Sequence, residues 1–204
     1  MARWYAKLTR RSLPEFQDLA RRMAGGLPQG ACVLEVAPGP GYFAIALAKL
    51  GQFEVTGIDV SKTFVDIARK NAQEEGVSVD FQQGNASRMP FADDRFNLIL
   101  CRAAFKNFSE PVQALREMRR VLHRGGKAVI IDLRSDTPQA EINKHIDAMN
   151  LSALNTLLTK WSFRFMLLKR AYTREQFERM IAESHWQNPE IRDAPVGFEI
   201  TLTK

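Results

Sequence analysis

Cysteine and histidine are scarce in this chain. The cysteines, Cys32 and Cys101, lie far apart, and neither belongs to a CxxC or Cys/His pattern with metal-ligand spacing. We therefore expect free, buried thiols and neither a disulfide nor a metal site. The chain also lacks an apolar run of the roughly 20 residues that cross a bilayer, and its first residues lack the apolar core of a secretory signal. These absences predict a cytoplasmic protein without a transmembrane segment.

The composition that remains is typical of one folded domain. The 204 residues are 45% hydrophobic and 25% charged, which is enough to bury a substantial core. No repeat, low-complexity tract or linker divides the chain. The formal net charge of +6 leaves an anionic substrate or nucleic acid open as a partner. However, no basic run is interleaved with aromatic residues as in single-strand binders, so we find no strong nucleic-acid signal, and a solvated basic helix face explains the charge more simply.

Segments with strand and helix patterns alternate through the first two thirds of the chain. The sequence Ser12-Leu-Pro-Glu15 has the form of a capping box, so we expect a helix to start there. The expected strands are 31–36, 53–59, 77–82, 95–101 and 127–133, and the expected helices between them are 40–50, 61–75 and 111–122. This alternation predicts a parallel sheet with right-handed crossovers.

The last part of the chain has a different pattern. Residues 138–170 carry apolar side chains at helical spacing, and Thr173 is a candidate helix cap. Two short strands, 190–194 and 198–202, are expected to form an antiparallel hairpin. The apolar segment 151–170 fits a lid over a lipophilic substrate, a dimer face or a membrane-surface helix, and ordinary core packing explains it equally well.

Residues 33–43 carry the strongest chemical signal. An apolar run containing Glu35 stops at Gly39-Pro-Gly41, and a helical pattern begins at once. Glycines at such a turn let a ligand approach the backbone, with a helix N-terminus behind it. The next expected strand ends at Asp59, a second acid beside the same turn. Two acids at this place suit a ligand with a ribose and a positive charge, and S-adenosylmethionine has both.

The same turn also fits a nicotinamide cofactor. Residues 39–44 match the dinucleotide pattern G-x-G-x-x-A, and Asp59 lies near the distance at which dehydrogenases place a ribose-binding acid. A catalytic Tyr-x-x-x-Lys would favour that hypothesis, but none of the three tyrosines forms one.

Later motifs distinguish the two cofactors. Residues 83–100, Q-G-N-A and then M-P-F-A-D-D-R-F-N-L-I-L, resemble the G-D-A…L-P-F…D-x-x-F-D segment of class I S-adenosylmethionine-dependent methyltransferases. Residues 115–126 resemble the same family's helix ending in R-V-L-K-P-G-G, and residues 33–41 resemble its V-L-D-V-G-C-G-T-G. The matches cover about residues 30–135 in the right order. The most similar group is the small-molecule branch with the ubiquinone and menaquinone biosynthesis methyltransferases.

This resemblance implies a fold and an activity. The fold is a doubly wound, Rossmann-like α/β sheet of seven strands in the order 3-2-1-4-5-7-6, with strand 7 antiparallel. The activity is methyl transfer from S-adenosyl-L-methionine to a small, apolar or anionic acceptor, catalysed mainly by positioning. A homodimer is left open. A non-catalytic S-adenosylmethionine-binding module that acts through a partner, and a nicotinamide-dependent oxidoreductase, are the alternatives.

Within a single domain, 1–204, we expect four parts. They are an N-terminal helical cap (1–29), a cofactor-binding core (30–135), a helical insertion or lid (136–172), and the last helix with the terminal β-hairpin (173–204).

The resemblance also implies which residues contact the cofactor. Glu35 would orient the cofactor's amino group and Asp59 would accept both ribose hydroxyls, although acids that only fix the turn or cap a helix are the simpler alternatives. Asn85 replaces the family's Asp, which predicts cofactor binding weaker by about 1 kcal/mol. Pro38 and Pro40 remove two amide donors from the turn. The full set of expected contacts is Glu35, Ala37, Gly39, Gly41, Asp59, Val60, Asn85, Ala86 and Cys101.

The acceptor side gives weaker signals. The loop after the fourth strand, 101–108, faces the substrate in this fold, so Arg102 and Phe105 are candidate pocket residues, as is Tyr5 ahead of the first helix. His145 borders an apolar helix face and is also a candidate for the pocket. Arg102 and His145 are the candidate catalytic residues, and a packing or surface role is the alternative for each. No obligatory catalytic motif is expected, because a sulfonium is already activated.

Overall fold

A computed structural model describes residues 2, 6, 9–148, 168–194 and 196–204, with only the backbone at 145 and 148. Its strands form one seven-stranded sheet in the order β3-β2-β1-β4-β5-β7-β6. β7 runs antiparallel to β5 and β6, and the other neighbours are parallel. The strand order and the antiparallel β7 implied by the family resemblance are confirmed. The strands are β1 (Cys32–Val36), β2 (Glu54–Asp59), β3 (Asp80–Gln83), β4 (Phe96–Arg102), β5 (Leu122–Leu133), β6 (Glu190–Ala194) and β7 (Gly197–Thr203).

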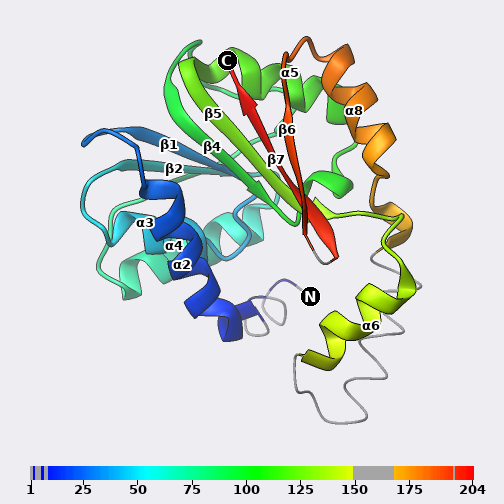
Figure 1. Ribbon diagram of the computed structural model, residues 1–204. Helices are drawn as coiled ribbons and strands as arrows, with labels where there is room; N and C mark the ends of the chain where they lie inside the picture. Colours follow the sequence, from blue (N-terminus) through cyan, green and yellow to red (C-terminus); the bar gives the residue numbers. More distant parts are fainter. Residues whose placement is uncertain (1, 3–5, 7–8, 149–167, 195) are drawn as a thin grey trace.

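Helices cover both faces of this sheet. α2, α3 and α4 lie on one face and α5 and α8 on the other, whereas α6 lies near the edge at which β4 and β5 end (Figure 1). The helices are η1 (Arg10–Ser12), α2 (Leu13–Ala24), α3 (Tyr42–Ala48), α4 (Lys62–Glu74), η2 (Phe105–Asn107), α5 (Pro111–Val121), α6 (Gln139–Ala148), η4 (Leu168–Arg170) and α8 (Arg174–Glu183).

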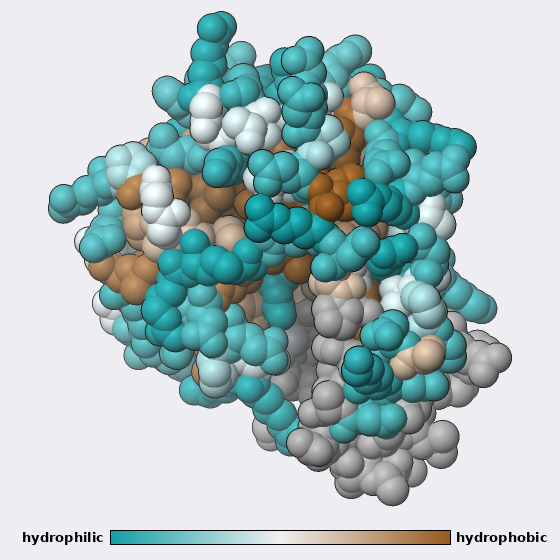
Figure 2. Space-filling model, viewed as in Figure 1, coloured by the Kyte–Doolittle hydropathy of each residue, from teal (hydrophilic) through white to brown (hydrophobic). Residues whose placement is uncertain are grey.

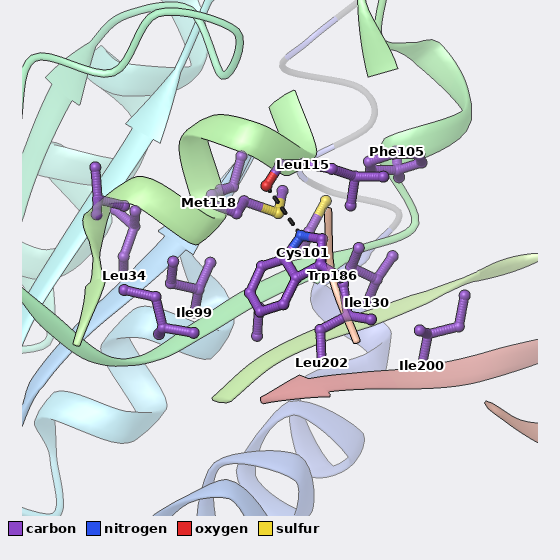
Figure 3. Close-up of a cluster of buried hydrophobic side chains, with 14 of the residues drawn as sticks. Leu34, Ile99, Cys101, Phe105, Leu115, Met118, Ile130, Trp186, Ile200 and Leu202 are labelled. Carbon is purple, nitrogen blue, oxygen red and sulfur yellow. Dashed lines mark hydrogen bonds between the residues drawn. The ribbon is translucent and has the colours of Figure 1, made fainter. Parts of the chain in front are cut away.

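The larger core lies between the sheet and the α5–α8 layer. Alternate side chains of β4, β5 and β7 point into it together with the apolar faces of the two helices. Trp186 is buried at its centre, and its indole Nε1 donates to the backbone oxygen of Leu115 at 3.1 Å, so the ring is packed without an unpaired donor (Figure 3). The residues labelled there are Leu34, Ile99, Cys101, Phe105, Leu115, Met118, Ile130, Trp186, Ile200 and Leu202.

The second core lies between the sheet and α2, α3 and α4. Phe81 of β3 is fully buried in it and packs against two glycines. A Cβ at Gly41 or at Gly57 would come within 2.6 Å of the Phe81 ring. Gly41 also has φ +79, which disfavours any other residue. Both glycines are therefore required by packing.

Three helices start where the sequence predicts, but only two of them have the predicted side-chain cap. The Ser61 hydroxyl accepts from the Phe64 amide at 3.4 Å, and Thr173 forms a complete capping box with Gln176. The capping box predicted at Ser12 is wrong, because Ser12 ends the 3-10 turn η1 and its side chain makes no cap hydrogen bond. The turn η1 runs directly into α2, and its Arg10 oxygen accepts from the Leu13 amide. This first amide of α2 therefore needs no side-chain cap.

One strand is longer than its sequence pattern indicates. β5 starts at Leu122, where the pattern predicted residue 127, because Leu122 pairs with Phe96 of β4. The Gly125 amide also donates to the Lys204 carbonyl at 2.8 Å. Tertiary pairing extends this strand through residues whose local pattern is not strand-like.

The outer surface of the face in Figure 2 is mostly hydrophilic, and hydrophobic residues are visible mainly towards its middle (Figure 2). No helix in the described ranges is both long enough and apolar enough to cross a membrane.

Candidate functional site

The carboxyl ends of β1, β2 and β4 meet at one edge of the sheet. β1 pairs with β2 on one side and with β4 on the other, so the strand order reverses beside β1. In open α/β sheets, ligands bind at such a switch point, outside the carboxyl ends of the strands. The turn 37–41 follows β1, Asp59 ends β2 and Arg102 ends β4. The fold thus brings together three groups that lie far apart in the sequence.

The turn after β1 is held by its own amides. The Ala37 amide donates to the Ile58 oxygen at 2.8 Å, and the Gly41 amide donates to the Pro38 oxygen at 3.0 Å. Ala37 has φ +57, a left-handed conformation that disfavours a residue with a Cβ by about 1–2 kcal/mol. The turn is therefore fixed and strained, and these two amides already have backbone acceptors.

Glu35 is a buried acid behind this turn. Its side chain is on the α3 side of the sheet, and the residue is only 4% exposed. Oε2 accepts from the Ala44 amide in the first turn of α3 at 3.0 Å. Burial raises the pKa of Glu35 to about 8; the Ala44 amide and the Arg102 charge act in the opposite direction, and Asp59 adds to the rise. A buried carboxyl with such a pKa favours a cationic partner.

Asp59 connects the turn to the start of α4. Its Oδ2 accepts from the Gly39 amide at 3.1 Å, and its Oδ1 accepts from the Ser61 amide at 2.8 Å. Burial raises the pKa of Asp59, and the two amides oppose that rise. The simpler alternative, an acid that caps a helix, describes part of this geometry. Each oxygen still has a second lone pair with which to accept from a ligand hydroxyl.

Two residues beside Asp59 are open to solvent. Val60 is 72% exposed, although it is a large apolar residue that directly follows the buried strand. Asn85 is also exposed, and its Oδ1 accepts from the Ser87 amide at 2.9 Å. Ala86, which follows Asn85, is half-buried. An exposed apolar side chain next to amide groups suits the face and edge of a purine.

Arg102 lies at the end of β4, against α2. Its guanidinium carbon is 4.5 Å from the centre of the Phe16 ring, and Nη2 lies 3.3 Å from Glu15 Oε2. Two expected contacts on the same stretch are buried. Cys101 points into the larger core, where burial raises the pKa of its thiol well above the ordinary value. Phe105 is buried and supports the loop from inside.

The remaining candidates cannot be placed. Tyr5 lies outside the described residues, as does most of the segment 151–170, of which only Leu168–Arg170 is described. His145 is in α6, but its side chain is outside the described part of the chain.

Sequence reasoning missed a buried ion pair beside Arg102. Lys106 Nζ lies 2.7 Å from Asp132 Oδ1, with side chains 7% and 2% exposed. The Lys106 amide also donates to Asp132 Oδ2 at 3.0 Å, and Nζ donates to the Ala103 oxygen at 2.7 Å. Ala103 has φ +56, so this pair holds a strained loop. The available signal was Asp132 inside the apolar run of a buried strand, where an acid needs a partner.

One hollow in the described part of the structure lies away from this edge of the sheet. It has a volume of about 100 Å³ and lies among η1, α2, α3 and α4, with Arg10, Tyr42 and Asn71 in its wall. Small-molecule pockets usually measure roughly 300–1,000 Å³, so it is too small for a nucleoside.

Comparison with known proteins shows what this part of the chain is similar to. Residues 34–130 match the family model described as a methyltransferase domain. This match supports a class I S-adenosylmethionine-dependent methyltransferase. The matched range includes the turn, Glu35, Asp59, Asn85 and Arg102, so the family's core coincides with the candidate site.

Individual relatives are consistent with this methyltransferase assignment. The uncharacterised methyltransferase YcgJ of Bacillus subtilis is 35% identical over 145 residues, which are 69% of this chain and 57% of YcgJ. The demethylmenaquinone methyltransferase of Deinococcus radiodurans is 40% identical over 101 residues, which are 49% of this chain and 42% of that protein. The chain thus spans about half the length of these curated relatives.

Solved structures support the methyltransferase fold. A protein of Methanococcus maripaludis described as an S-adenosyl-L-methionine-dependent methyltransferase superposes with a TM-score of 0.74 at 24% identity, covering 100% of this chain and 91% of that one.

Proposed function

We propose that this protein is an enzyme that transfers a methyl group from S-adenosyl-L-methionine to a small-molecule acceptor. The observation that carries the proposal is the pair of buried carboxyls, Glu35 and Asp59, at neighbouring strand ends around a glycine turn. Glu35 has no cationic partner among the described residues within hydrogen-bond distance, so a cation that binds there would offset the cost of burying its charged form.

The residues present fit this cofactor. Glu35 would hold the amino group, Asp59 would accept from the ribose hydroxyls, Val60 would cover one face of adenine, and Asn85 and Ala86 would meet its edge. The cofactor supplies a methyl group that is already activated on a sulfonium. The protein's residues would orient the two reactants and exclude water. Positioning of this kind supplies a large part of the reduction in the activation free energy of methyl transfer.

The acceptor is expected to be small and either apolar or anionic. A relative named for demethylmenaquinone supports a small-molecule acceptor. The apolar segment within 136–172 would act as the lid over it, or as the face of a homodimer. We also expect a cytoplasmic location, because Cys32 and Cys101 are free thiols, which suit a reducing compartment.

Isothermal titration with S-adenosylhomocysteine and with NAD tests this function. We expect the first to bind and the second not to bind. Asp59→Asn should weaken S-adenosylhomocysteine by about tenfold or more, since it loses a charge-assisted acceptor for ribose. Asp66→Asn, on the exposed surface of α4, is the matched control and should change nothing.

Each other outcome would reject the proposal in a specific way. Binding of NAD alone would favour the oxidoreductase. Binding of neither ligand would favour a module that acts through a partner. A third outcome is that the protein binds S-adenosylhomocysteine but does not produce it from S-adenosylmethionine when a reduced demethylmenaquinone analogue is supplied. That outcome would reject this class of acceptor but would leave the cofactor site supported.

A further inference from the structure

We propose that Arg102 binds the carboxylate of the cofactor's amino-acid end, so that Glu35 and Arg102 together form a site for a zwitterion. The inference rests on the proposed function and adds to it the group that recognises the charged tail of the ligand.

The register of the sheet places the two charges side by side. Glu35 of β1 is paired with Leu100 of β4. Residues two apart on a strand share a face, so Arg102 follows Leu100 on the face that carries Glu35, one step nearer the carboxyl edge. Leu100 belongs to the core on the α2–α3 side, which agrees with this placement. The charge of Arg102 lowers the pKa of Glu35 against the effect of burial.

The two side chains are near each other without being paired. Among the described residues, the ion pair of Arg102 is with Glu15, and the carboxyl of Glu35 accepts from the Ala44 amide. A direct Glu35–Arg102 pair would neutralise both groups. Because each is left available, a ligand with an ammonium and a carboxylate on one carbon can satisfy both charges at once.

The guanidinium of Arg102 is held in place but has spare donors. It stacks on Phe16 at 4.5 Å, a contact that fixes the plane of the group. Of the roughly five N–H donors of a guanidinium, one is directed at Glu15, at 3.3 Å. The Glu15 side chain is 67% exposed, and such exposed pairs are worth at most about 1 kcal/mol. A ligand carboxylate in bidentate contact would therefore displace Glu15 or bind beside it.

Two ligands that differ only in the amino-acid end test the inference. S-adenosylhomocysteine carries this end, and 5′-methylthioadenosine has the same nucleoside and sulfur without it. We expect Arg102→Met to raise the dissociation constant of S-adenosylhomocysteine by about tenfold or more, and that of methylthioadenosine by less than about twofold, as measured by isothermal titration.

Arg22→Met is the matched control. Arg22 also anchors α2 to the sheet, through two 2.7 Å hydrogen bonds to Glu199 of β7. Glu199 lies two strands from Arg102, with Ile131 of β5 between them in the register. Arg22→Met should leave both affinities unchanged. Arg102→Lys should recover part of the lost affinity, because it keeps the charge and loses the fork.

Three results would overturn the inference while leaving the proposed function in place. Equal weakening of both ligands by Arg102→Met would show that Arg102 acts by docking α2. Unchanged binding of S-adenosylhomocysteine would show that the guanidinium faces another group. Wild-type protein that binds methylthioadenosine as tightly as S-adenosylhomocysteine would show that no site for the amino-acid end exists, while leaving the nucleoside site intact. If wild-type protein binds neither ligand, the proposed function itself fails, and the inference fails with it.

Discussion

At the scale of single residues, Asn85 is the clearest departure from the family pattern. Its Oδ1 already accepts from the Ser87 amide at 2.9 Å, and its amide nitrogen can only donate. We expect Asn85→Asp to strengthen S-adenosylhomocysteine binding by about 1 kcal/mol, or about fivefold, because the second carboxylate oxygen can accept from the adenine amine. Isothermal titration measures this change.

Asn188→Asp gives a matched control for that substitution. Asn188 is exposed in the loop before β6, far from the turn, and should leave binding as it is. An affinity that stays the same or falls in Asn85→Asp would contradict the assigned role of this position.

Sequence reasoning identified the acids of the site but not their surroundings. Glu35 and Asp59 were found because each ends or interrupts an apolar run beside a glycine turn. The burial of Phe105 could not be predicted from the residues around it in the sequence. Phe177 and Tyr172, which pack against it, come from a distant segment of the chain. The Lys106–Asp132 pair was missed for the same reason, because η2 supplies Lys106 and β5 supplies Asp132, 26 residues later.

At the scale of elements, the loop from β4 to η2 depends on one buried ion pair. Replacing a single partner, in Asp132→Asn or Lys106→Met, leaves a charge or a set of donors buried without its counterpart. We expect each single substitution to lower the free energy of unfolding by about 3–5 kcal/mol. The double variant should lose clearly less than the sum of the two, as measured by urea unfolding.

An exposed pair provides the comparison. Lys62 and Asp66 lie one turn apart on the surface of α4, 2.9 Å from each other. The corresponding Lys62→Met and Asp66→Asn changes should stay within about 0.5 kcal/mol. Strict additivity at Lys106 and Asp132 would show that their contact does not hold the loop.

Element boundaries were predictable where local chemistry sets them. Ser61 and Thr173 cap their helices as expected, because a side chain three residues from an amide needs no distant partner. The start of β5 and the absence of a side-chain cap on α2 were not predictable, since pairing with β4 and the preceding turn η1 decide them.

At the scale of the whole molecule, Glu35 links stability to pH. Its pKa is raised from 4.5 to about 8. In the unfolded chain this carboxyl ionises near its ordinary pKa, whereas the folded protein keeps the proton until about pH 8. The free energy of unfolding therefore falls as pH rises between these values.

Glu35→Gln removes this loss while its amide oxygen can still accept from Ala44. We expect the variant to be more stable than the wild type by on the order of 3 kcal/mol near pH 8, with little difference near pH 4.5. Thermal unfolding followed across this range measures the effect. The same variant should bind S-adenosylhomocysteine more weakly. Parallel pH profiles of the two proteins would refute the buried-acid account.

The Phe81 ring packs against Gly41 and Gly57, so the residues at these three positions must change together during evolution. Positions 41, 57 and 81 cannot drift independently, because a larger residue at either glycine demands a smaller one at 81. A genetic screen for variants that no longer bind ligand would therefore recover substitutions at these positions that act by disrupting the core. The substitutions that identify ligand contacts would be those of the charged side chains around the turn.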